Sequence, residues 1–479
     1  MEGKKRASWS GQVAFILAAA ASAIGLGNLW RFPYLAAQYG GGTFLVIYLA
    51  LVVTLGFTLM LTEITIGRAT QQSQLTAYSR LYKGWGFIGL IATVVPILIV
   101  PYYCVIGGWV LKYFVTYAQM AFTGAQPMGA GAAESGAFFS GFISANFAPF
   151  GYGILFVLGC ATVIVLGVKN GIEKSNLVLM PLLFLLALAI SIYVVCLPGT
   201  GEGIKYYLLP NLDCLCDANG KFSVATLGKT ILGAMGQMFY SLSLAMGIMV
   251  TYGSYMKKTD SIERCVRRIE VFDTLIALIA GLMIIPVVYM FAIKTGTPVK
   301  EAMNAGPGLM FITLPKVFAM LGTAGTWLGL AFFALVIFAA ATSAISLYEA
   351  CVASVCDLLH IERKPATFFT GALICFLSAF SALGYGAWGD ITVFGLQFLD
   401  FFDIVTSCFL MPIAAILTCL FVGWVIKPKA IIDEVEAEGH PFRAKHFFAF
   451  MVRYVAPAFV TAILISEVCR NLKIGGWSI

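Results

Sequence analysis

Long apolar runs recur from one end of this chain to the other. Each run has about 20 residues or more, which is the length that a helix needs to cross a hydrocarbon core of about 30 Å. Of the 479 residues, 60% are hydrophobic and only 11% are charged, so the apolar side chains far exceed what one soluble core could bury. We therefore predict an all-α polytopic membrane protein with eleven transmembrane helices, at approximately residues 12–37, 42–67, 87–121, 151–168, 176–197, 227–256, 271–293, 325–358, 366–385, 398–426 and 447–470.

An odd number of spans places the two termini on opposite sides of the membrane. If the N-terminus lies inside, most of the 30 Lys and Arg residues fall in loops that also lie inside, as the positive-inside rule requires. We therefore predict a multi-pass membrane protein, embedded in the lipid bilayer, with a cytoplasmic N-terminus and an external C-terminus. The net charge of +7 then reflects topology, and these scattered loops form no basic face for nucleic acid. The sequence indicates no particular oligomeric state.

Two of the predicted spans are interrupted near their middle by small or polar residues. The first contains Ser22-Ala-Ile-Gly-Leu-Gly-Asn28, and the sixth contains Ser241-Leu-Ser-Leu-Ala-Met-Gly247. Close helix packing through small residues would explain either segment alone. However, glycine weakens a helix, and unwound backbone at this depth is tolerated only around a cavity.

The spacing of the two breaks favours the cavity. The second break lies five spans after the first, and breaks in the first helix of each five-helix half are typical of inverted-repeat transporters with a binding site at mid-membrane. We predict one membrane transporter domain over residues 1–479, built as a 5+5 inverted repeat with broken helices 1 and 6. The first repeat covers about 10–197, the second about 225–426, and an extra helix about 447–470.

The residues around the breaks suit a cation and a zwitterion. Unwound carbonyls and hydroxyls are oxygen ligands of the kind that sodium takes, while freed amides at the start of a half-helix attract a carboxylate. Asn28, Ser241 and Asp273 are candidates to supply side-chain oxygens from three helices. Thr342 and Ser343 are candidates in the eighth span, although hydroxyls in a helix often bond back to their own backbone.

Charged residues inside apolar spans are expensive, so each of them needs a role. Arg31 ends the first span on the outer side and Asp403 begins the tenth there, which permits an ion pair across an outer vestibule. The alternative is that each is a solvated charge at a helix end. The charges that we single out are Arg31, Glu63, Asp273, Asp357, Asp400 and Asp403.

Five motifs occur in a fixed order along the chain. They are Gly25-Leu-Gly-Asn-Leu-Trp-Arg-Phe-Pro33 with Gly40-Gly-Gly42, Gly171-Ile-Glu-Lys174, the segment 237–255, Gly306-Pro-Gly308 with Phe311-Ile-Thr-Leu-Pro315, and the segment 339–343. In these motifs the chain resembles the neurotransmitter:sodium symporters, particularly the bacterial amino-acid members. The resemblance covers nearly the whole chain, and the absence of a twelfth helix matches bacterial members that have eleven. The resemblance therefore implies a protein of the bacterial inner (plasma) membrane.

The resemblance implies coupling to Na⁺ through two sodium sites. The first site would consist of the Ala23 carbonyl, Asn28, Ser241, Asp273 and the carboxylate of the substrate. The second site would consist of the carbonyls of Ala21, Ile24 and Ala339 and the hydroxyls of Thr342 and Ser343.

The resemblance also implies a place for an amino-acid substrate and for two gates. The substrate-binding residues would be Ser22, Ala23, Leu26, Gly27, Ile99, Tyr103, Tyr240, Ser241, Ser243, Met246, Ser343 and Leu347. In this set, the amides of Leu26 and Gly27 and the Tyr103 hydroxyl would meet the substrate carboxylate. The outer gate would consist of Arg31 and Asp403 with Tyr103 and Tyr240, and the inner gate of Arg6, Trp9, Tyr255 and Asp357.

Two departures from the usual family pattern affect the expected chemistry. Gly25 stands where amine-transporting members carry aspartate, so the substrate itself must bring the carboxylate that completes the first sodium site. Asp273 stands where asparagine is usual, and its fixed negative charge predicts that chloride is not required.

We therefore predict a sodium-coupled secondary active symporter that imports neutral hydrophobic or aromatic L-amino acids by alternating access. An intramembrane enzyme is disfavoured, because the three histidines lie in loops or at a helix end and no His-Glu-x-x-His zinc motif occurs. The alternative is a non-transporting amino-acid sensor on the same fold, whose binding residues would look the same.

Overall fold

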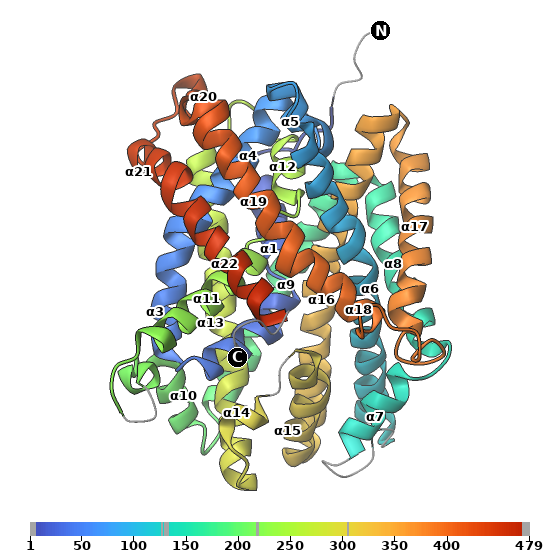
Figure 1. Cartoon of the computed structure of the whole chain (residues 1–479). Helices are drawn as coiled ribbons and strands as arrows, with labels where there is room; N and C mark the ends of the chain where they lie inside the picture. Colours follow the sequence, from blue (N-terminus) through green and yellow to red (C-terminus); the bar gives the residue numbers. More distant parts are fainter. Residues whose placement is uncertain (1–5, 126–127, 129–133, 217–219, 304–305, 472–479) are drawn as a thin grey trace.

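The protein is an elongated bundle of helices (Figure 1). The structure, a computed structural model, describes residues 6–125, 128, 134–216, 220–303 and 306–471. These residues form no β-sheet, and isolated bridges such as Gly41 to Pro210 are their only β-type pairing. Both chain ends, and with them the predicted sides of the two termini, lie outside the described residues.

The helices differ widely in length. They are α1 (Gln12–Ala23), α2 (Phe32–Gln38), α3 (Gly42–Leu51), α4 (Phe57–Thr70), α5 (Gln74–Leu81), α6 (Gly86–Thr123), α7 (Glu134–Ile143), α8 (Ala148–Val165), α9 (Lys174–Val195), α10 (Gly201–Leu208), α11 (Val224–Ser241), α12 (Ile248–Gly253), α13 (Ile262–Thr295), α14 (Val299–Ala302), α15 (Leu314–Met320), α16 (Gly322–Leu359), α17 (Arg363–Leu383), α18 (Phe398–Asp403), α19 (Met411–Leu420), α20 (Lys427–Val435), α21 (Lys445–Phe450) and α22 (Ala456–Asn471). Single π-helical turns, such as Gly27–Arg31 before α2 and Val52–Gly56 between α3 and α4, join several of them.

Nine helical segments in the described part of the chain are long and apolar enough to cross a membrane. They are Gly42–Thr70, Gly86–Thr123, Ala148–Val165, Val168–Val195, Ile262–Thr295, Gly322–Leu359, Arg363–Leu383, Phe398–Val425 and Lys445–Arg470. A tenth results if Gln12–Ala23 and Gly27–Gln38, which are bent by 53° relative to one another, count as one span. The predicted sixth span is divided into α11 and α12, so the predicted number of eleven is reached only when both broken helices are counted as spans.

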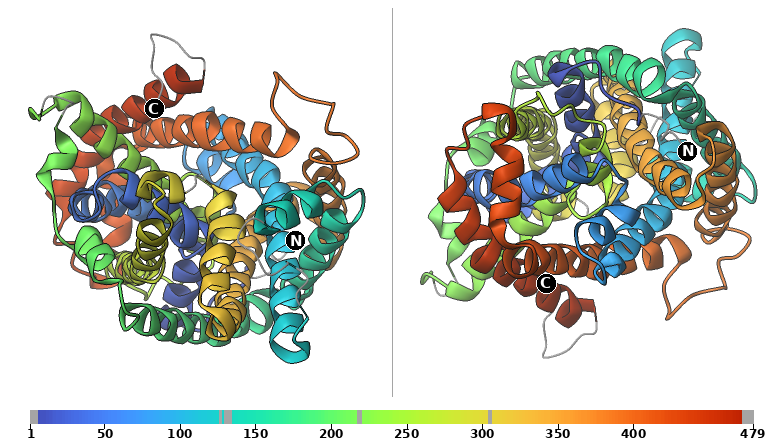
Figure 2. Two further views of the ribbon diagram at one scale, coloured as in Figure 1. Left: turned by 90° about the horizontal axis from the view of Figure 1, so that it is seen from below. Right: turned by 90° about the horizontal axis from the view of Figure 1, so that it is seen from above.

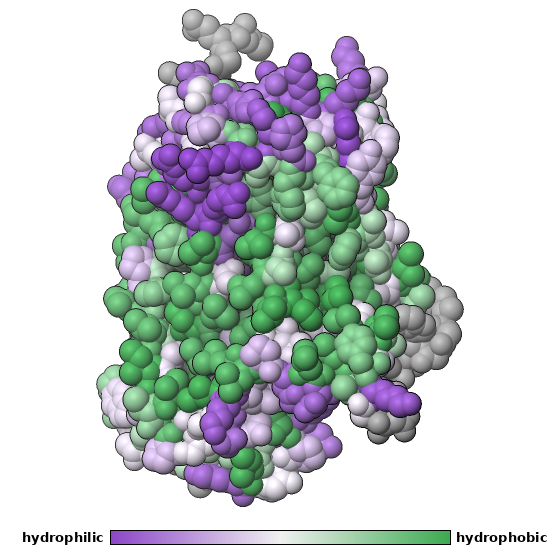
Figure 3. Space-filling view, turned by 90° about the vertical axis from the view of Figure 1, so that its left-hand side faces the viewer, coloured by the Kyte–Doolittle hydropathy of each residue, from purple (hydrophilic) through white to green (hydrophobic). Residues whose placement is uncertain are grey.

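The outer surface of the bundle suits contact with lipid. Figure 3 shows a hydrophobic band at mid-height between more hydrophilic ends. Large apolar side chains in the spans are more than half exposed, among them Leu155, Leu158, Leu185, Phe369 and Phe376. An apolar surface of this extent is typical of a membrane-spanning protein.

The two predicted breaks are present in the structure. α1 ends at Ala23, where Ile24 adopts extended backbone with φ −77° and ψ 94°, and helix resumes from Gly27. α11 ends at Ser241, and three left-handed residues follow within five positions: Ser243 (φ 53°), Ala245 (φ 57°) and Gly247 (φ 72°). Left-handed backbone cannot continue a right-handed helix, so the chain unwinds between α11 and α12.

Both breaks lie inside the bundle. α1 packs against α13 and α16, and α12 packs against α4 and α16. Viewed from either end, the long helices pack around one another (Figure 2). We name the two ends of the bundle after helices in Figure 1: the α20 end, with α5, α12 and α20 at the top, and the α15 end, with α10, α14 and α15 at the bottom.

Glycine allows α4 and α12 to approach closely. A Cβ atom added to Gly67 on α4 would lie 1.9 Å from the Val250 carbonyl oxygen, and one added to Gly253 on α12 would lie 2.4 Å from the Ile64 carbonyl oxygen. Such distances require backbone to move. α12 is therefore fixed against an unbroken helix by contacts that tolerate no side chain.

Replacing Gly67 by alanine should destabilise the fold by about 1–3 kcal/mol, because the added methyl group overpacks the α4 to α12 contact. Thermal unfolding in detergent measures the effect. Gly159→Ala is the matched control: its Cβ would meet nothing within 4 Å, and alanine favours a helix by roughly 0.5–1 kcal/mol. If the two variants unfold at the same temperature, the close approach of α4 and α12 is wrong.

Candidate functional site

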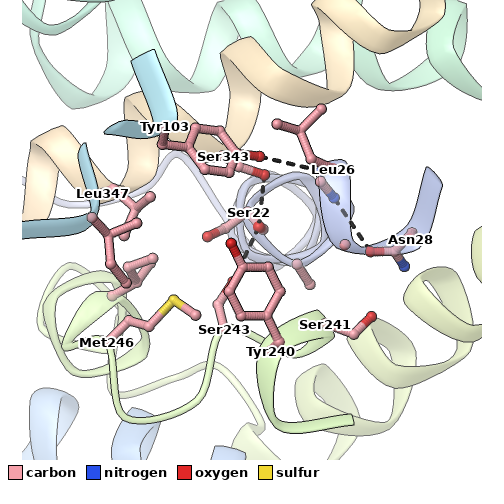
Figure 4. A pocket seen from close by; sticks show the side chains of 15 residues that line it. Ser22, Leu26, Asn28, Tyr103, Tyr240, Ser241, Ser243, Met246, Ser343 and Leu347 are labelled. Carbon is pink, nitrogen blue, oxygen red and sulfur yellow. Dashed lines mark hydrogen bonds between the residues drawn. The ribbon is translucent and has the colours of Figure 1, made fainter. Parts of the chain in front are cut away.

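The two breaks line one narrow cavity in the middle of the bundle (Figure 4). Its volume is about 20 Å³. Its walls contain every residue of the expected substrate-binding set, and also Gly25, Asn28 and Ile248; the full lining is Ser22, Ala23, Gly25, Leu26, Gly27, Asn28, Ile99, Tyr103, Tyr240, Ser241, Ser243, Met246, Ile248, Ser343 and Leu347. The sequence analysis did not include Ile248, which directly follows the second break.

Side chains from other helices bond the unwound backbone of α1. The Leu26 amide donates to the Tyr103 hydroxyl at 3.2 Å. The hydroxyls of Ser243 and Ser343 both donate to the Ser22 carbonyl, at 3.1 and 3.0 Å. Each of these bonds joins the first break to a different neighbouring element, so the break is held from several sides.

Asp273 on α13 is the centre of a buried polar cluster. Asn28 Nδ2 donates to its Oδ1 at 2.8 Å, Ser241 Oγ lies 3.0 and 3.1 Å from its two oxygens, and the Tyr48 hydroxyl lies 3.4 Å from Oδ2. Asp273 and Asn28 are fully buried. All of these partners are neutral, so the carboxylate lacks a positive side chain within this cluster, and a bound cation would supply the missing charge.

The oxygens expected to form the second sodium site, between α1 and α16, are only partly brought together. Ser343 on α16 reaches the Ile24 carbonyl of α1 at 3.4 Å. Thr342 instead donates to the carbonyls of Phe338 and Ala339 in its own helix, at 3.0 and 3.1 Å. Thr342 thus bonds back to its own helix, which is the alternative that the sequence left open for both hydroxyls. Ser343 instead bonds across to α1.

One end of the cavity is apolar. Figure 4 shows Met246 and Leu347 at one end, and Asn28 and Ser241 at the opposite end. Ile99, Met246 and Leu347 are all at least 96% buried and carry no charge. The present volume is too small for a large side chain, so these residues must move to admit one. Met246 is suited to this, because its unbranched thioether re-packs readily.

The α20 end of the site is closed by bonded residues. Arg6 Nη1 lies 2.8 and 3.0 Å from the two oxygens of Asp357, and its guanidinium lies over the Tyr255 ring at 5.2 Å. Trp9 is fully buried, and its indole N–H donates to the Tyr252 carbonyl at 3.0 Å. The four residues expected to form the inner gate are therefore together.

The α15 end is different. A vestibule of about 360 Å³ lies at this end, and its walls include Tyr103, Tyr240, Arg31 and Asp403. The expected ion pair is not formed here: the Arg31 guanidinium lies over the Tyr240 ring at 5.3 Å. Asp403 instead accepts hydrogen bonds from Tyr102 and Ser407, at 3.0 and 2.9 Å. Two neutral hydroxyls thus take the place of the expected basic partner.

The remaining charges that we singled out also have partners. Glu63 on α4 accepts a hydrogen bond from the Ala245 amide at 2.7 Å, which satisfies unwound backbone of the second break. Asp400 lines the vestibule and accepts from the Tyr385 hydroxyl at 3.1 Å. Glu63 is therefore part of the site's framework, and Asp400 is part of the vestibule wall.

The sequence analysis missed one buried ion pair near the α20 end. Glu349 on α16 is fully buried and pairs with both Nη atoms of Arg363, with Nη1 at 2.9 Å. The Tyr255 hydroxyl donates to Glu349 at 2.7 Å, which connects this pair to the gate around Arg6. The signal was available, because Glu349 is a charge inside an apolar span just as Glu63 is.

Comparisons with known proteins identify the family to which the chain is similar. A model of the sodium:neurotransmitter symporter family matches residues 6–127 and 151–476. The uncharacterized sodium-dependent transporter YhdH of Bacillus subtilis (strain 168) is 32% identical over 469 residues, which cover 97% of this chain and 98% of that protein. The sodium- and chloride-dependent GABA transporter 2 of Homo sapiens is 26% identical over 509 residues, with 97% and 80% covered. The crystal structure of MhsT in complex with L-phenylalanine is similar with a TM-score of 0.83 and 34% identity, covering 97% of this chain and 100% of that chain.

Replacing Asp357 by asparagine should make the cavity more accessible from the α20 end, because it removes the charge that holds Arg6. A loss of about 1.4 kcal/mol from the closed state corresponds to about tenfold in the open population. The measurement is the rate at which a membrane-impermeant maleimide labels Ser22→Cys from that side, corrected for native cysteines. Lys445→Gln breaks an exposed ion pair at the same end and serves as the control. Equal labelling rates in both variants would mean that Arg6 and Asp357 do not gate the cavity.

Proposed function

Because the chain belongs to the sodium:neurotransmitter symporter family, we propose that it imports neutral hydrophobic or aromatic L-amino acids together with sodium by alternating access. The family and the similar structure are transporters, so the chain is a membrane transporter and not an enzyme. Two broken helices around one buried cavity carry the proposal. Such a cavity offers free backbone groups to a zwitterion in a place where water is scarce.

The two ends of the cavity suit the two parts of an amino acid. In the structure the Leu26 amide donates a hydrogen bond to the Tyr103 hydroxyl. In the proposed pose this amide donates to the substrate carboxylate instead, and the carboxylate lies beside Asn28 and the first sodium site. Its side chain points the other way, between Met246 and Leu347. These apolar neighbours offer no partner to a charged side chain. MhsT, which is similar in structure, holds L-phenylalanine, and this supports an apolar or aromatic substrate.

Gly25 supports a substrate that carries its own carboxylate. A Cβ atom at this position would lie 2.6 Å from Ser343 Oγ and 2.9 Å from the Tyr103 hydroxyl. An aspartate here would therefore occupy the space next to the proposed sodium and carboxylate positions. With glycine, that space stays available to the substrate, and amines without a carboxylate lack the group that completes the first sodium site.

We place one sodium ion at Asp273 and a second between α1 and α16. Around Asp273, the Ser241 hydroxyl already lies beside the carboxylate, and the Ala23 carbonyl and Asn28 Oδ1 would complete the set. Asn28 now turns its Nδ2 toward Asp273, so its amide would have to turn over to present the oxygen. The second ion would use freed carbonyls of α1 with Ser343, and Thr342 would have to turn from its own helix toward α1. The carbonyl and hydroxyl oxygens of this second site are uncharged ligands of the kind that suits sodium.

Asp273 also supports independence from chloride. In chloride-dependent members that this chain resembles, the anion lies among residues matching Tyr48, Gln237, Ser241 and Ala277. Here the hydroxyls of Tyr48 and Ser241 both lie against the Asp273 carboxylate, so donors that would bind an anion already have a negative partner. A chloride ion added beside this carboxylate would be repelled in a low-dielectric setting.

We assign the α20 end to the cytoplasm. Basic residues gather there: Arg68 and Lys258 pair with Glu434 of α20, Lys427 begins α20 and Lys445 begins α21. The positive-inside rule supports this orientation. The gate around Arg6 then closes the cytoplasmic side, and the vestibule opens outward. Transport would alternate the two by moving the halves of about 10–197 and 225–426 against each other.

The first prediction from this proposal is sodium-dependent uptake of L-phenylalanine and L-leucine into proteoliposomes that contain the purified protein. Lysine, glutamate and phenethylamine should compete at least about tenfold more weakly, because a charged side chain or a missing carboxylate finds no partner in the cavity. Gly25→Asp should abolish uptake by filling the carboxylate position. Amino-acid binding without uptake would favour the sensor instead, and strong competition by phenethylamine would refute the proposed substrate pose.

A second prediction concerns Asp273. Asp273→Asn should weaken the apparent sodium affinity, since it removes the charge that faces the ion, and it should make uptake respond to added chloride. The measurement is uptake against sodium concentration in chloride and in gluconate. Glu202→Gln, which removes an exposed carboxylate at the α15 end, should behave as the wild type. A wild type that already needs chloride, or an Asp273→Asn variant indifferent to it, would show that this carboxylate does not replace the anion.

A further inference from the structure

Glu270 on α13 is a buried carboxylate that the proposed transport mechanism does not use. The residue is only 5% exposed. Its Oε1 atom is fully buried, and it has no hydrogen-bond partner in the part of the chain that the structure describes. An unpartnered carboxylate inside a membrane span is costly, so its presence calls for a functional explanation.

Other acidic residues buried in the bundle have donors that hold them. Glu173 accepts from the Ser10 amide at 3.0 Å, and Glu63 accepts from the Ala245 amide at 2.7 Å. Glu349 pairs with Arg363. Each of these three carboxylates has at least one bonded donor, although Glu63 Oε2, like Glu270 Oε1, has no partner in the described part of the chain. Glu270 differs because neither the backbone nor a charged side chain bonds it there.

The basic residue one turn before Glu270 is bonded to another carboxylate. Arg267 lies one turn earlier on α13, and its Nε and Nη2 atoms both donate to Glu263 Oε1, at 3.2 and 3.0 Å. Its guanidinium also lies over the Phe57 ring at 4.6 Å. Arg267 is therefore directed toward Glu263 and forms no ion pair with Glu270.

The position of Glu270 relates it to the first sodium site. It lies three residues before Asp273 on the same helix, which is about 4.5 Å along the helix axis and on a neighbouring part of the same face. α13 begins at Ile262 close to the α20 end, where the Asp260 carbonyl bonds Arg68 beside α20. Glu270 thus lies between Asp273 and the end of the bundle that we assign to the cytoplasm.

We propose that Glu270 is a sodium-binding carboxylate that the ion of the first site meets on its way from Asp273 to the cytoplasm. The inference rests on the proposed function, because it takes Asp273 as a sodium ligand. A cation that leaves Asp273 toward the cytoplasm passes through a low-dielectric region, where a second carboxylate about one turn away lowers the cost of the transfer. In return, the passing ion gives Glu270 an ionic partner.

Because Glu270 lies only on the cytoplasmic side of Asp273, its charge should affect the half-saturating sodium concentration mainly when sodium is added on that side. Glu270→Gln keeps the shape of the side chain and removes the charge. We expect the half-saturating sodium concentration to rise about fivefold when sodium acts from the cytoplasmic side, and to change less than about twofold from the outside. Glu270→Asp keeps the charge but shortens the side chain, so a smaller rise is expected.

The measurement is sodium-dependent phenylalanine transport in right-side-out and inside-out membrane vesicles, together with ²²Na⁺ binding to the purified full-length protein. Glu438→Gln, which removes an exposed carboxylate at the α20 end, controls for the surface charge of that side and should leave both sodium dependences unchanged. Thermal unfolding is a further readout: Glu270→Gln should unfold at the same temperature as the wild type or higher, because no bond is lost.

Three results would overturn the proposal. The first is an unchanged sodium dependence on the cytoplasmic side, and the second is an equal shift on both sides. The third is a changed pH dependence at unaltered sodium affinity, which would make Glu270 a proton site. If Glu270→Gln does not fold, Glu270→Asp decides by the same side-specific comparison. If the wild type shows no sodium-dependent transport, the proposed function fails, and ²²Na⁺ binding then tests Glu270 by itself.

Discussion

Unwound backbone inside an apolar bundle must find partners for its amides and carbonyls, and the whole site depends on how this chain supplies them. Glu63 accepts from the Ala245 amide of the second break, while Ser343 donates to the Ser22 carbonyl of the first. These two partners stand on α4 and α16, which are unbroken helices. A rigid frame thus keeps both breaks unwound, and the cavity between them is a property of the fold.

The charged residues at the two ends of the cavity are arranged differently. At the α20 end, Arg6 pairs with Asp357, and the Glu349 to Arg363 pair is connected to them through Tyr255. At the α15 end, Asp403 is held by hydroxyls and Arg31 lies over a ring, and the ion pair of Glu467 with Arg470 in the vestibule wall lies within one helix, α22. Ion pairs between helices resist separation more than contacts with neutral groups do. This asymmetry describes a molecule whose cytoplasmic side, in our assignment, is the more firmly closed.

Much of the fold could be predicted from the sequence, because span length and helix breaks are local properties. Apolar runs of the right length gave the spans, and Gly25 and Gly247 marked the places where helix is weakest. The choice of partners is not local. That Thr342 bonds its own helix, or that Arg31 lies over Tyr240, depends on side-chain conformation and on which of several nearby groups is closest. The residues brought together at the cavity were therefore predictable from the family resemblance, whereas their bonds were not.

The division of the cavity into two ends has a consequence for how such a protein can diverge. The end of the cavity beside the first sodium site is built from unwound backbone and from Asp273. A substitution elsewhere in the cavity leaves both in place. Met246 and Leu347 shape the other end, and Ile99 is a further apolar side chain of the lining; the three stand on three separate elements. Mutations at these three positions can alter which side chain fits without touching the ligands of the ions. Substrate range and energy coupling are thus separately evolvable, and a lineage can acquire a new nutrient while keeping its sodium chemistry.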